Sequence, residues 1–378
     1  MKAASILIPA ALVLNAAELK NPGQENRHLV AHEWGTFTSV AGEDGSPVTW
    51  APLFGAPDLP CFVSRLALGA LTKWQISGLV RMETPVLYFY SQRPTTLSVR
   101  VDFPKGLITE WYPPASKVGP NPAAVGPVYR NGSLQWDQVS VLPGAHLEFP
   151  STSGASRYYT ARQTDSAPLS IGGQPEKLIF YRGVGSFPPS LRPRYRRDGK
   201  IEIRNAGADP IPLAILFENH GGRVGFQTVR EIQDGATLDP PVLTGDIEQF
   251  RKELATSLVE FGLYPKEASA MVETWRDSWF EEGTRVLYIV SRQEVDSLLP
   301  LRVTPTPVET ARVFVGRVEV LSPATRETLQ EAARRGDSQT LEEFGRFLGL
   351  FARRMELSGP ALQNAMAALA RNTSSRIQ

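Results

Sequence analysis

Short apolar runs separated by turn-forming residues make up most of the chain between residues 29 and 231. The runs are rich in Val, Ile, Tyr, Phe and Thr, and Gly, Pro, Asn and Asp punctuate them, as is typical of β-strands joined by turns. Strands are predicted over residues 36–40, 84–90, 97–103, 107–111, 177–182, 200–204 and 212–217. Asp198-Gly199 predicts a two-residue hairpin turn, because both residue types tolerate a positive φ. Many short antiparallel strands favour a sandwich or a related barrel.

The spacing of the apolar residues changes after residue 244 from that of strands to that of helices. They then recur every three or four positions, at Ile247, Phe250, Leu254, Leu258 and Phe261, which predicts an amphipathic helix. A second helix is predicted over residues 265–282, with a proline in its first turn. Residues 285–291 and 312–321 predict strands. From Ser322-Pro323 onward the pattern predicts helices, broken near residues 336–337 and again before residue 360.

The two patterns together predict an α+β fold, with a mainly antiparallel β-sandwich-like body and a helical α/β C-terminal part. We expect a β-rich domain over residues 28–240 and an α/β region over residues 241–378. The strands predicted after residue 244 can complete the sheets of the first part, so both regions can share one core.

The first 17 residues have the parts of a secretory signal peptide. Lys2 gives a basic start, an apolar run covers residues 3–14, and the small residues Ala16 and Ala17 follow. The run is shorter than the roughly 20 apolar residues of a membrane-spanning helix, and no later segment predicts a transmembrane span. We therefore expect a periplasmic or secreted protein whose mature chain starts between residues 16 and 20. The alternative is an ordinary apolar helix or strand.

Composition narrows the range of partners. Hydrophobic residues make up 42% of the chain, which is enough for a packed core. With 40 basic and 39 acidic side chains the formal net charge is +1, so no overall attraction to nucleic acid is expected. Because Cys61 is the single cysteine, no intrachain disulfide can form, and its apolar neighbours predict a buried, unreactive side chain.

The chain has four histidines, and two of them, His32 and His220, stand within two positions of a glutamate and are followed by a glycine within three positions. His32 and Glu33 are adjacent, so in a strand they point to opposite faces and cannot bind one metal ion together. One of them facing a cleft would act as a metal ligand (His32) or a general base (Glu33). The alternative is a histidine hydrogen-bonded within the sheet and a glutamate paired with an arginine. A zinc-protease motif is excluded, since no second histidine stands four positions away.

Glu218 and His220 lie two positions apart at the end of a predicted strand, so their side chains share one face. The pair suits metal chelation or acid–base chemistry, and Gly221-Gly222 lets a ligand approach the backbone closely. Zinc normally needs at least three protein ligands, so the pair is incomplete alone. The alternative is a charged strand end before a glycine turn. We expect this pair to meet His32 or Glu33 across a cleft.

Further carboxylates could complete such a site. Glu83 opens an apolar strand that would bury it unless it is paired, which makes it a second candidate catalytic residue. Asp277 and Glu281 are four positions apart, on one face of a predicted helix. Such a pair can bind a hard cation, although like charges at this spacing are also typical of a solvated helix end.

Three segments carry a resemblance to known sequences. The stretch HEWGTFTSV, residues 32–40, resembles the opening of uncharacterised exported proteins of environmental bacteria. ETPVLYFY at residues 83–90 and EGTRVLY at residues 282–288 are similar to later segments of that group. The resemblance spans most of the chain and implies export. It implies no activity, so the roles of individual residues rest on their chemistry alone.

Two functions remain open from the sequence. The first is an exported metal-dependent hydrolase, with Glu33 and Glu83 as catalytic residues and with His32, Glu218 and His220 as ligands of a divalent metal ion that activates water. The second is a non-catalytic β-sandwich protein that binds a glycan, a peptide or a partner protein; a small-molecule ligand is the further alternative. Convergence of the five side chains in one cleft favours the hydrolase, and their scattering favours the binding protein.

Overall fold

The computed structural model of the protein describes residues 28–42, 44–53, 59–66, 76–120, 130–153 and 156–374. The predicted signal peptide, residues 1–17, lies outside the described residues. Within the described ranges, no helix combines the length and the apolar character needed to cross a membrane.

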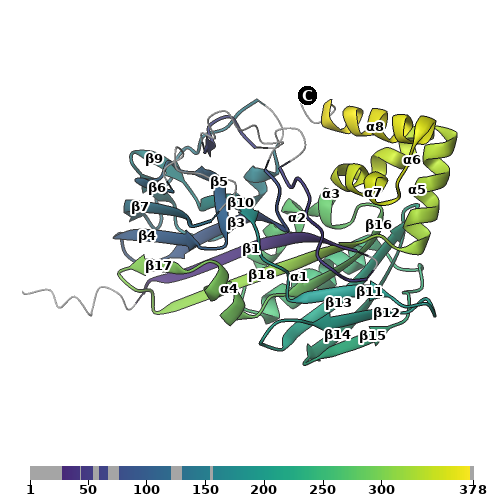
Figure 1. Ribbon diagram of the computed structural model, residues 1–378. Helices are drawn as coiled ribbons and strands as arrows, with labels where there is room; N and C mark the ends of the chain where they lie inside the picture. The colour runs from purple at the N-terminus through teal and green to yellow at the C-terminus, as the bar shows by residue number, and fades with distance from the viewer. Residues whose placement is uncertain are drawn as a thin grey trace, which may run out of the picture.

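A nine-stranded sheet forms the centre of the molecule (Figure 1). In spatial order its strands are β14 (Arg223–Ile232), β13 (Ile211–His220), β16 (Gly283–Ile289), β18 (Glu309–Val320), β1 (Val30–Ala41), β3 (Val80–Tyr90), β10 (Ile179–Gly185), β5 (Gly106–Tyr112) and β2 (Ser64–Arg65). Neighbouring strands are antiparallel except β1 and β18, which run parallel. Strands from both sides of residue 240 therefore belong to one sheet.

Two smaller antiparallel sheets pack against one face of the central sheet and give the body its sandwich-like character. Their strands are β17 (Leu301–Thr304), β4 (Thr95–Phe103), β7 (Gly132–Val141), β8 (Leu169–Ile171), β9 (Gln174–Glu176) and β6 (Lys117–Gly119) in one, and β11 (Leu191–Tyr195), β12 (Ile201–Asn205) and β15 (Gly235–Leu238) in the other. Phe37 and Met82 of the central sheet share a core with Trp136 and Ile203 of the smaller sheets. Buried and less buried residues alternate along β4, as one-sided packing requires.

Helices cover the other face of the central sheet. They are η3 (Arg157–Arg162), α1 (Ile247–Glu260), α2 (Pro265–Thr274) and α3 (Arg276–Trp279). The prediction of a single helix over residues 265–282 is wrong, because the helix is interrupted at Trp275, between α2 and α3. The carbonyl groups of Trp279 and Glu281 accept hydrogen bonds from the Arg285 guanidinium, at 3.0 and 2.6 Å, instead of extending the helical ladder.

The C-terminal helices form a unit of their own at one end of the central sheet, coloured yellow-green to yellow in Figure 1. They are α5 (Pro323–Arg335), α6 (Ser338–Glu343), η4 (Gly345–Phe347), α7 (Leu348–Arg354) and α8 (Gly359–Ser374), whereas α4 (Arg292–Leu298) lies earlier, between β16 and β17. Ser322 caps α5 by accepting a hydrogen bond from the Thr325 N–H at 3.0 Å, and Gly336 ends it with φ +71°. Both ends were predicted.

The predicted fold class is confirmed, and each predicted strand overlaps an observed one, with ends that differ by one or two residues over 177–182, 200–204, 285–291 and 312–321. A turn at Asp198-Gly199 joins β11 and β12 as predicted, with φ +81° at the glycine. It is a three-residue loop and not the predicted two-residue turn, because the Arg196 N–H donates to the Lys200 carbonyl at 2.8 Å. The burial predicted for Cys61 is wrong. Cys61 lies in a turn closed by a hydrogen bond from the Val63 N–H to the Pro60 carbonyl, at 3.2 Å, and is exposed to solvent.

Candidate functional site

His32 lies on the helix-covered face of β1, in a cluster that we call the His32 site: His32, Tyr90, Tyr264, Glu267 and Glu309. His32 and Glu267 are buried, whereas Tyr264 and Glu309 are exposed at the outer side of the cluster. His32 Nδ1 lies 2.8 Å from Glu267 Oε2, and its ring centroid is 4.3 Å from that of Tyr264. The side chain is 1% exposed. Its Nε2 has no hydrogen-bond partner among the described residues, and the nearest carboxylate, Glu309 Oε1, is 4.0 Å away.

Glu267 is completely buried and its carboxylate is saturated with donors. Besides His32 it accepts hydrogen bonds from the Tyr90 hydroxyl and from the Tyr264 N–H, each at 2.8 Å. Burial and the Glu267 carboxylate both raise the pKa of Tyr90. The cluster therefore fixes the orientation of the His32 ring, in the way that a carboxylate orients a catalytic or metal-binding histidine.

Glu33 points to the opposite face of β1, so His32 and Glu33 are separated as predicted for a strand. Its Oε2 accepts a hydrogen bond from Arg312 Nε at 2.6 Å, and its Oε1 accepts one from the Tyr181 hydroxyl. Burial lowers the pKa of Arg312, but Glu33, Tyr181 and Asp296 together outweigh this effect and raise the pKa above its usual range. The predicted general base is thus held in a buried ion pair, which was the alternative stated above.

Glu83 is 2% exposed and paired with two arginines. Arg346 lies 2.8 Å from Glu83 Oε1 and Arg81 lies 4.0 Å from Oε2. Burial raises the pKa of Glu83, but the two guanidinium groups outweigh it and lower the pKa to about 2. A carboxylate with so low a pKa is a poor general base at neutral pH. The next residue, Thr84, has φ +45°, an uncommon and strained conformation for a β-branched residue.

Glu83 belongs to a larger buried group, which we call the arginine–glutamate network: Arg81, Glu83, Ser278, Glu281, Arg285, Arg317, Glu319 and Arg346. Arg285 Nε and Arg317 Nε each donate to Glu319 Oε1 at 2.7 Å. Arg317 and Arg346 both donate to Ser278 Oγ, at 2.8 and 3.3 Å. The network joins β3, β16 and β18 to α3 and to the C-terminal helical unit.

At the turn between β13 and β14 lies the His220 site: Tyr195, Glu218, His220, Glu282 and Thr284. His220 Nδ1 lies 3.3 Å from Glu282 Oε1, and Nε2 lies 3.8 Å from Glu218 Oε2. Tyr195 and Thr284 donate to the other oxygen of Glu218, at 2.9 and 3.3 Å. The His220 side chain is 21% exposed, whereas the carboxylates are 9% and 7% exposed.

The two histidine sites do not meet, so the predicted convergence is wrong. His32 pairs with Ala311 at one end of β18, whereas Thr284, the neighbour of Glu218, pairs with Val320 at the other end. At roughly 3.3 Å per residue these positions are about 30 Å apart. The cause is the parallel pairing of β1 with β18, which sets the two sites at opposite ends of the same strands.

Metal binding by the predicted ligands is limited to pairs. Among the described residues, no group of three or more His, Cys, Asp or Glu side chains could hold a metal ion. His220 with Glu218, and His32 with Glu309, each offer one nitrogen and one oxygen about 4 Å apart. Any cation at either place would need water for its remaining ligands.

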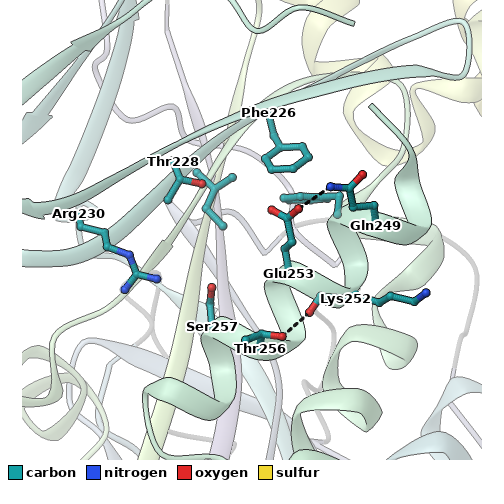
Figure 2. A pocket seen from close by; sticks show the side chains of 10 residues that line it. Phe226, Thr228, Arg230, Gln249, Lys252, Glu253, Thr256 and Ser257 are labelled. Atoms are coloured by element: carbon teal, nitrogen blue, oxygen red, sulfur yellow. Dashed lines mark hydrogen bonds between the residues drawn. The ribbon is translucent and has the colours of Figure 1, made fainter. Parts of the chain in front are cut away.

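A shallow groove of about 350 Å³ lies between β14 and α1, on the helix-covered side of the sheet. Figure 2 shows Phe226, Thr228 and Arg230 of β14 along one side and Gln249 and Glu253 of α1 along the other. The side chains of Ile215 and Phe250 also line it. Arg230 is ion-paired with Glu260 at 2.8 Å, and both side chains are about half exposed.

The partners that define these sites could not be found from the sequence. Glu267 is 235 positions from His32, and Arg312 is 279 positions from Glu33. Glu267 stands three positions after Tyr264 and accepts a hydrogen bond from the Tyr264 N–H, as the glutamate of a capping box does. The sequence signal of the helix start is Pro265 in the first turn. That signal predicts a helix start but gives no hint of the histidine.

Comparison with known proteins adds a distant structural likeness. No protein-family model and no curated protein matches the chain. Among solved structures, the chain is similar to the zebrafish (Danio rerio) Fcho1 Mu homology domain with a bound Eps15 peptide. The identity is 9%, the likeness covers 79% of this chain and 99% of that chain, and the TM-score is 0.30.

Proposed function

We propose that the protein is a non-catalytic binding protein that takes up an extended peptide along the open edge of β14. The metal-dependent hydrolase requires its side chains to converge on one water or metal ion. The structure does not meet this requirement. Glu33 and Glu83 each form ion pairs with buried arginines. His32 and His220 are about 30 Å apart, as the strand register gives. This scattering supports the binding protein.

The observation that carries the proposal is the outer edge of β14 from Phe226 to Arg230, which pairs with no other strand of the described residues. The Val224 carbonyl accepts a hydrogen bond from the Gly245 N–H at 2.8 Å, so the backbone of Val224 points away from β13. Outward and inward groups alternate in an antiparallel pair, so Phe226, Thr228 and Arg230 present their N–H and C=O groups to the same side. No other backbone group in the described part of the chain bonds to these three.

An exposed strand edge is a template for an added strand, and proteins usually protect it. The other edge of the sheet, β2, has two residues, whereas β14 has ten. The free part, from Phe226 to Arg230, is about 17 Å long and matches a peptide of about five residues. In such β-augmentation the backbone supplies affinity, and alternate side chains supply specificity.

The groove beside the edge gives the added strand a place for its side chains. Residues facing α1 would lie next to Phe226 and Thr228, against the flank of α1 that carries Lys252, Glu253 and Thr256. Phe226 offers an apolar surface, and Glu253 offers a negative charge at the rim (Figure 2). We therefore expect an extended peptide with an apolar side chain facing Phe226 and a basic one near Glu253.

The variant Thr228→Pro tests the proposal, because it removes an outward N–H and leaves the ladder to β13 intact. Thr228→Ala is the matched control, since it keeps the N–H. Linear peptides are selected on the immobilised full chain from a displayed random library, and the enriched peptides are then titrated against both variants. We expect Thr228→Pro to weaken binding about tenfold or more, which corresponds to about 1.4 kcal/mol, and Thr228→Ala to have little effect.

Amide hydrogen exchange gives an independent measure of where the peptide binds. Binding of the selected peptide should slow exchange at the outward amides of Phe226, Thr228 and Arg230. The proposal fails if no linear peptide is enriched, or if the enriched peptides bind Thr228→Pro as tightly as the wild type.

A further inference from the structure

The His220 site brings an imidazole nitrogen and a carboxylate oxygen to 3.8 Å from each other, with a second carboxylate on the other side of the ring. If Nδ1 of His220 donates its proton to Glu282, Nε2 carries a lone pair. That lone pair faces Glu218 Oε2 at 3.8 Å, which is too long for a hydrogen bond. The repulsion between a neutral nitrogen and a carboxylate oxygen is removed by a proton on Nε2 or by a metal ion bound to both atoms.

Contacts to the other atoms of the two side chains fix the positions of His220 Nε2 and Glu218 Oε2. The second oxygen of Glu218 is bound by the hydroxyls of Tyr195 and Thr284, at 2.9 and 3.3 Å. On the other side of the ring, Glu282 also accepts a hydrogen bond from the Gly221 N–H at 2.9 Å. The second carboxylate therefore orients the imidazole, as outer-shell carboxylates do for metal-binding histidines.

The arginine–glutamate network fixes the backbone that carries Glu282. Arg285 is completely buried, and its Nη2 donates to the Glu282 carbonyl at 2.8 Å while its Nε donates to Glu319. On the open side, Gly221 and Gly222 have φ values of +61° and +77° and carry no side chains that could block the approach. The network thus holds the backbone of Glu282 in place, and the glycine turn leaves the solvent side of His220 open.

We infer that His220 Nε2 and Glu218 Oε2 bind a divalent first-row transition-metal ion such as Zn²⁺, with water as the remaining ligands. Two ligands about 2.1 Å from a tetrahedral zinc ion are about 3.4 Å apart, so the pair needs to close by about 0.4 Å. One imidazole and one carboxylate suit zinc better than calcium or magnesium, which prefer oxygen ligands alone. The inference is independent of peptide binding at β14.

Calorimetric titration with ZnCl₂ tests the site on the full chain, after chelator treatment and dialysis. We expect saturable binding of one ion per chain in the wild type and its loss in His220→Ala. Glu218→Gln should weaken binding about tenfold or more, because a neutral amide oxygen replaces the carboxylate ligand. Glu282→Gln should weaken it about tenfold, through the orientation of the ring. His146→Ala is the matched control, because His146 is exposed and outside the site.

Two further measurements keep the test decisive. Thermal unfolding of each variant without metal shows whether His220→Ala still folds, and the ¹⁵N chemical shifts of the imidazole show whether Nε2 is the coordinating atom. The inference is overturned if the wild type binds no zinc in a saturable manner, if His220→Ala binds it unchanged, or if Glu218→Gln has the wild-type affinity. In the last case the imidazole alone would be the ligand.

Discussion

The His32 site and the His220 site are built alike but stand at opposite ends of β18. In each, one glutamate contacts Nδ1 of the histidine, and a second glutamate faces Nε2 at 4.0 or 3.8 Å. They differ in access. The His32 ring is 1% exposed and lies against Tyr264, whereas the His220 ring is 21% exposed beside two glycines. The same local chemistry therefore stabilises the core at one end and remains available to a ligand at the other.

Removal of the two histidines should show this difference most strongly. In His32→Ala the buried Glu267 carboxylate loses a donor and the core gains a cavity, so we expect a loss of about 3 to 5 kcal/mol in the free energy of unfolding. In His220→Ala the loss should be about 1 kcal/mol or less, because the pair is partly exposed. Urea denaturation measures both. Equal losses would mean that the two sites have the same role.

The arginine–glutamate network should make the free energy of unfolding depend on pH in the acid range, through the carboxylate of Glu83. Because the folded pKa of Glu83 is lowered from 4.5 to about 2, its ionised form stabilises the fold above pH 4.5. That stabilisation should be lost as the pH falls from about 4.5 towards 2, and a shift of this size corresponds to about 3 kcal/mol. Unfolding free energies measured over this range should fall less steeply in Glu83→Gln than in the wild type.

The pH prediction has a clear opposing outcome. If Glu83→Gln and the wild type lose stability in parallel below pH 4.5, Glu83 is not the group that titrates. Arg346→Met provides a second variant in case Glu83→Gln does not fold, since it removes the guanidinium that lies 2.8 Å from the carboxylate. It should raise the pKa of Glu83 and thereby shift the loss of stability to higher pH.

The elements of the fold could be predicted because their signals are local. Alternation along residues 97–103, the Asp198-Gly199 turn and the Ser322-Pro323 helix start each depend on neighbouring residues, and each is present in the structure. The failure over residues 265–282 has a non-local cause. Arg285 binds the carbonyls of residues 279, 281 and 282, and Asn219 binds that of Phe280, so these groups do not extend a helical ladder. No pattern within residues 265–282 records these contacts.

The local geometry of the candidate sites could be predicted from the sequence, but the contacts between distant segments could not. The opposed directions of His32 and Glu33 and the shared face of Glu218 and His220 follow from the two-residue period of a strand, and both are observed. Their convergence depended on which strands become neighbours. The parallel pairing of β1 with β18 joins segments almost 280 residues apart in the chain, and its register decides which ends meet.

The smallest expected effect on stability comes from the removal of one tyrosine hydroxyl at each histidine site. Tyr90 donates to Glu267 at 2.8 Å, and Tyr195 donates to Glu218 at 2.9 Å. Tyr90→Phe leaves a fully buried carboxylate short of a donor, so we expect a loss of about 2 kcal/mol in the free energy of unfolding. Tyr195→Phe should cost less than about 1 kcal/mol, because Glu218 retains the Thr284 hydroxyl and lies nearer to solvent. Urea denaturation of both variants decides the order, and a reversed order would assign the structural role to the His220 site.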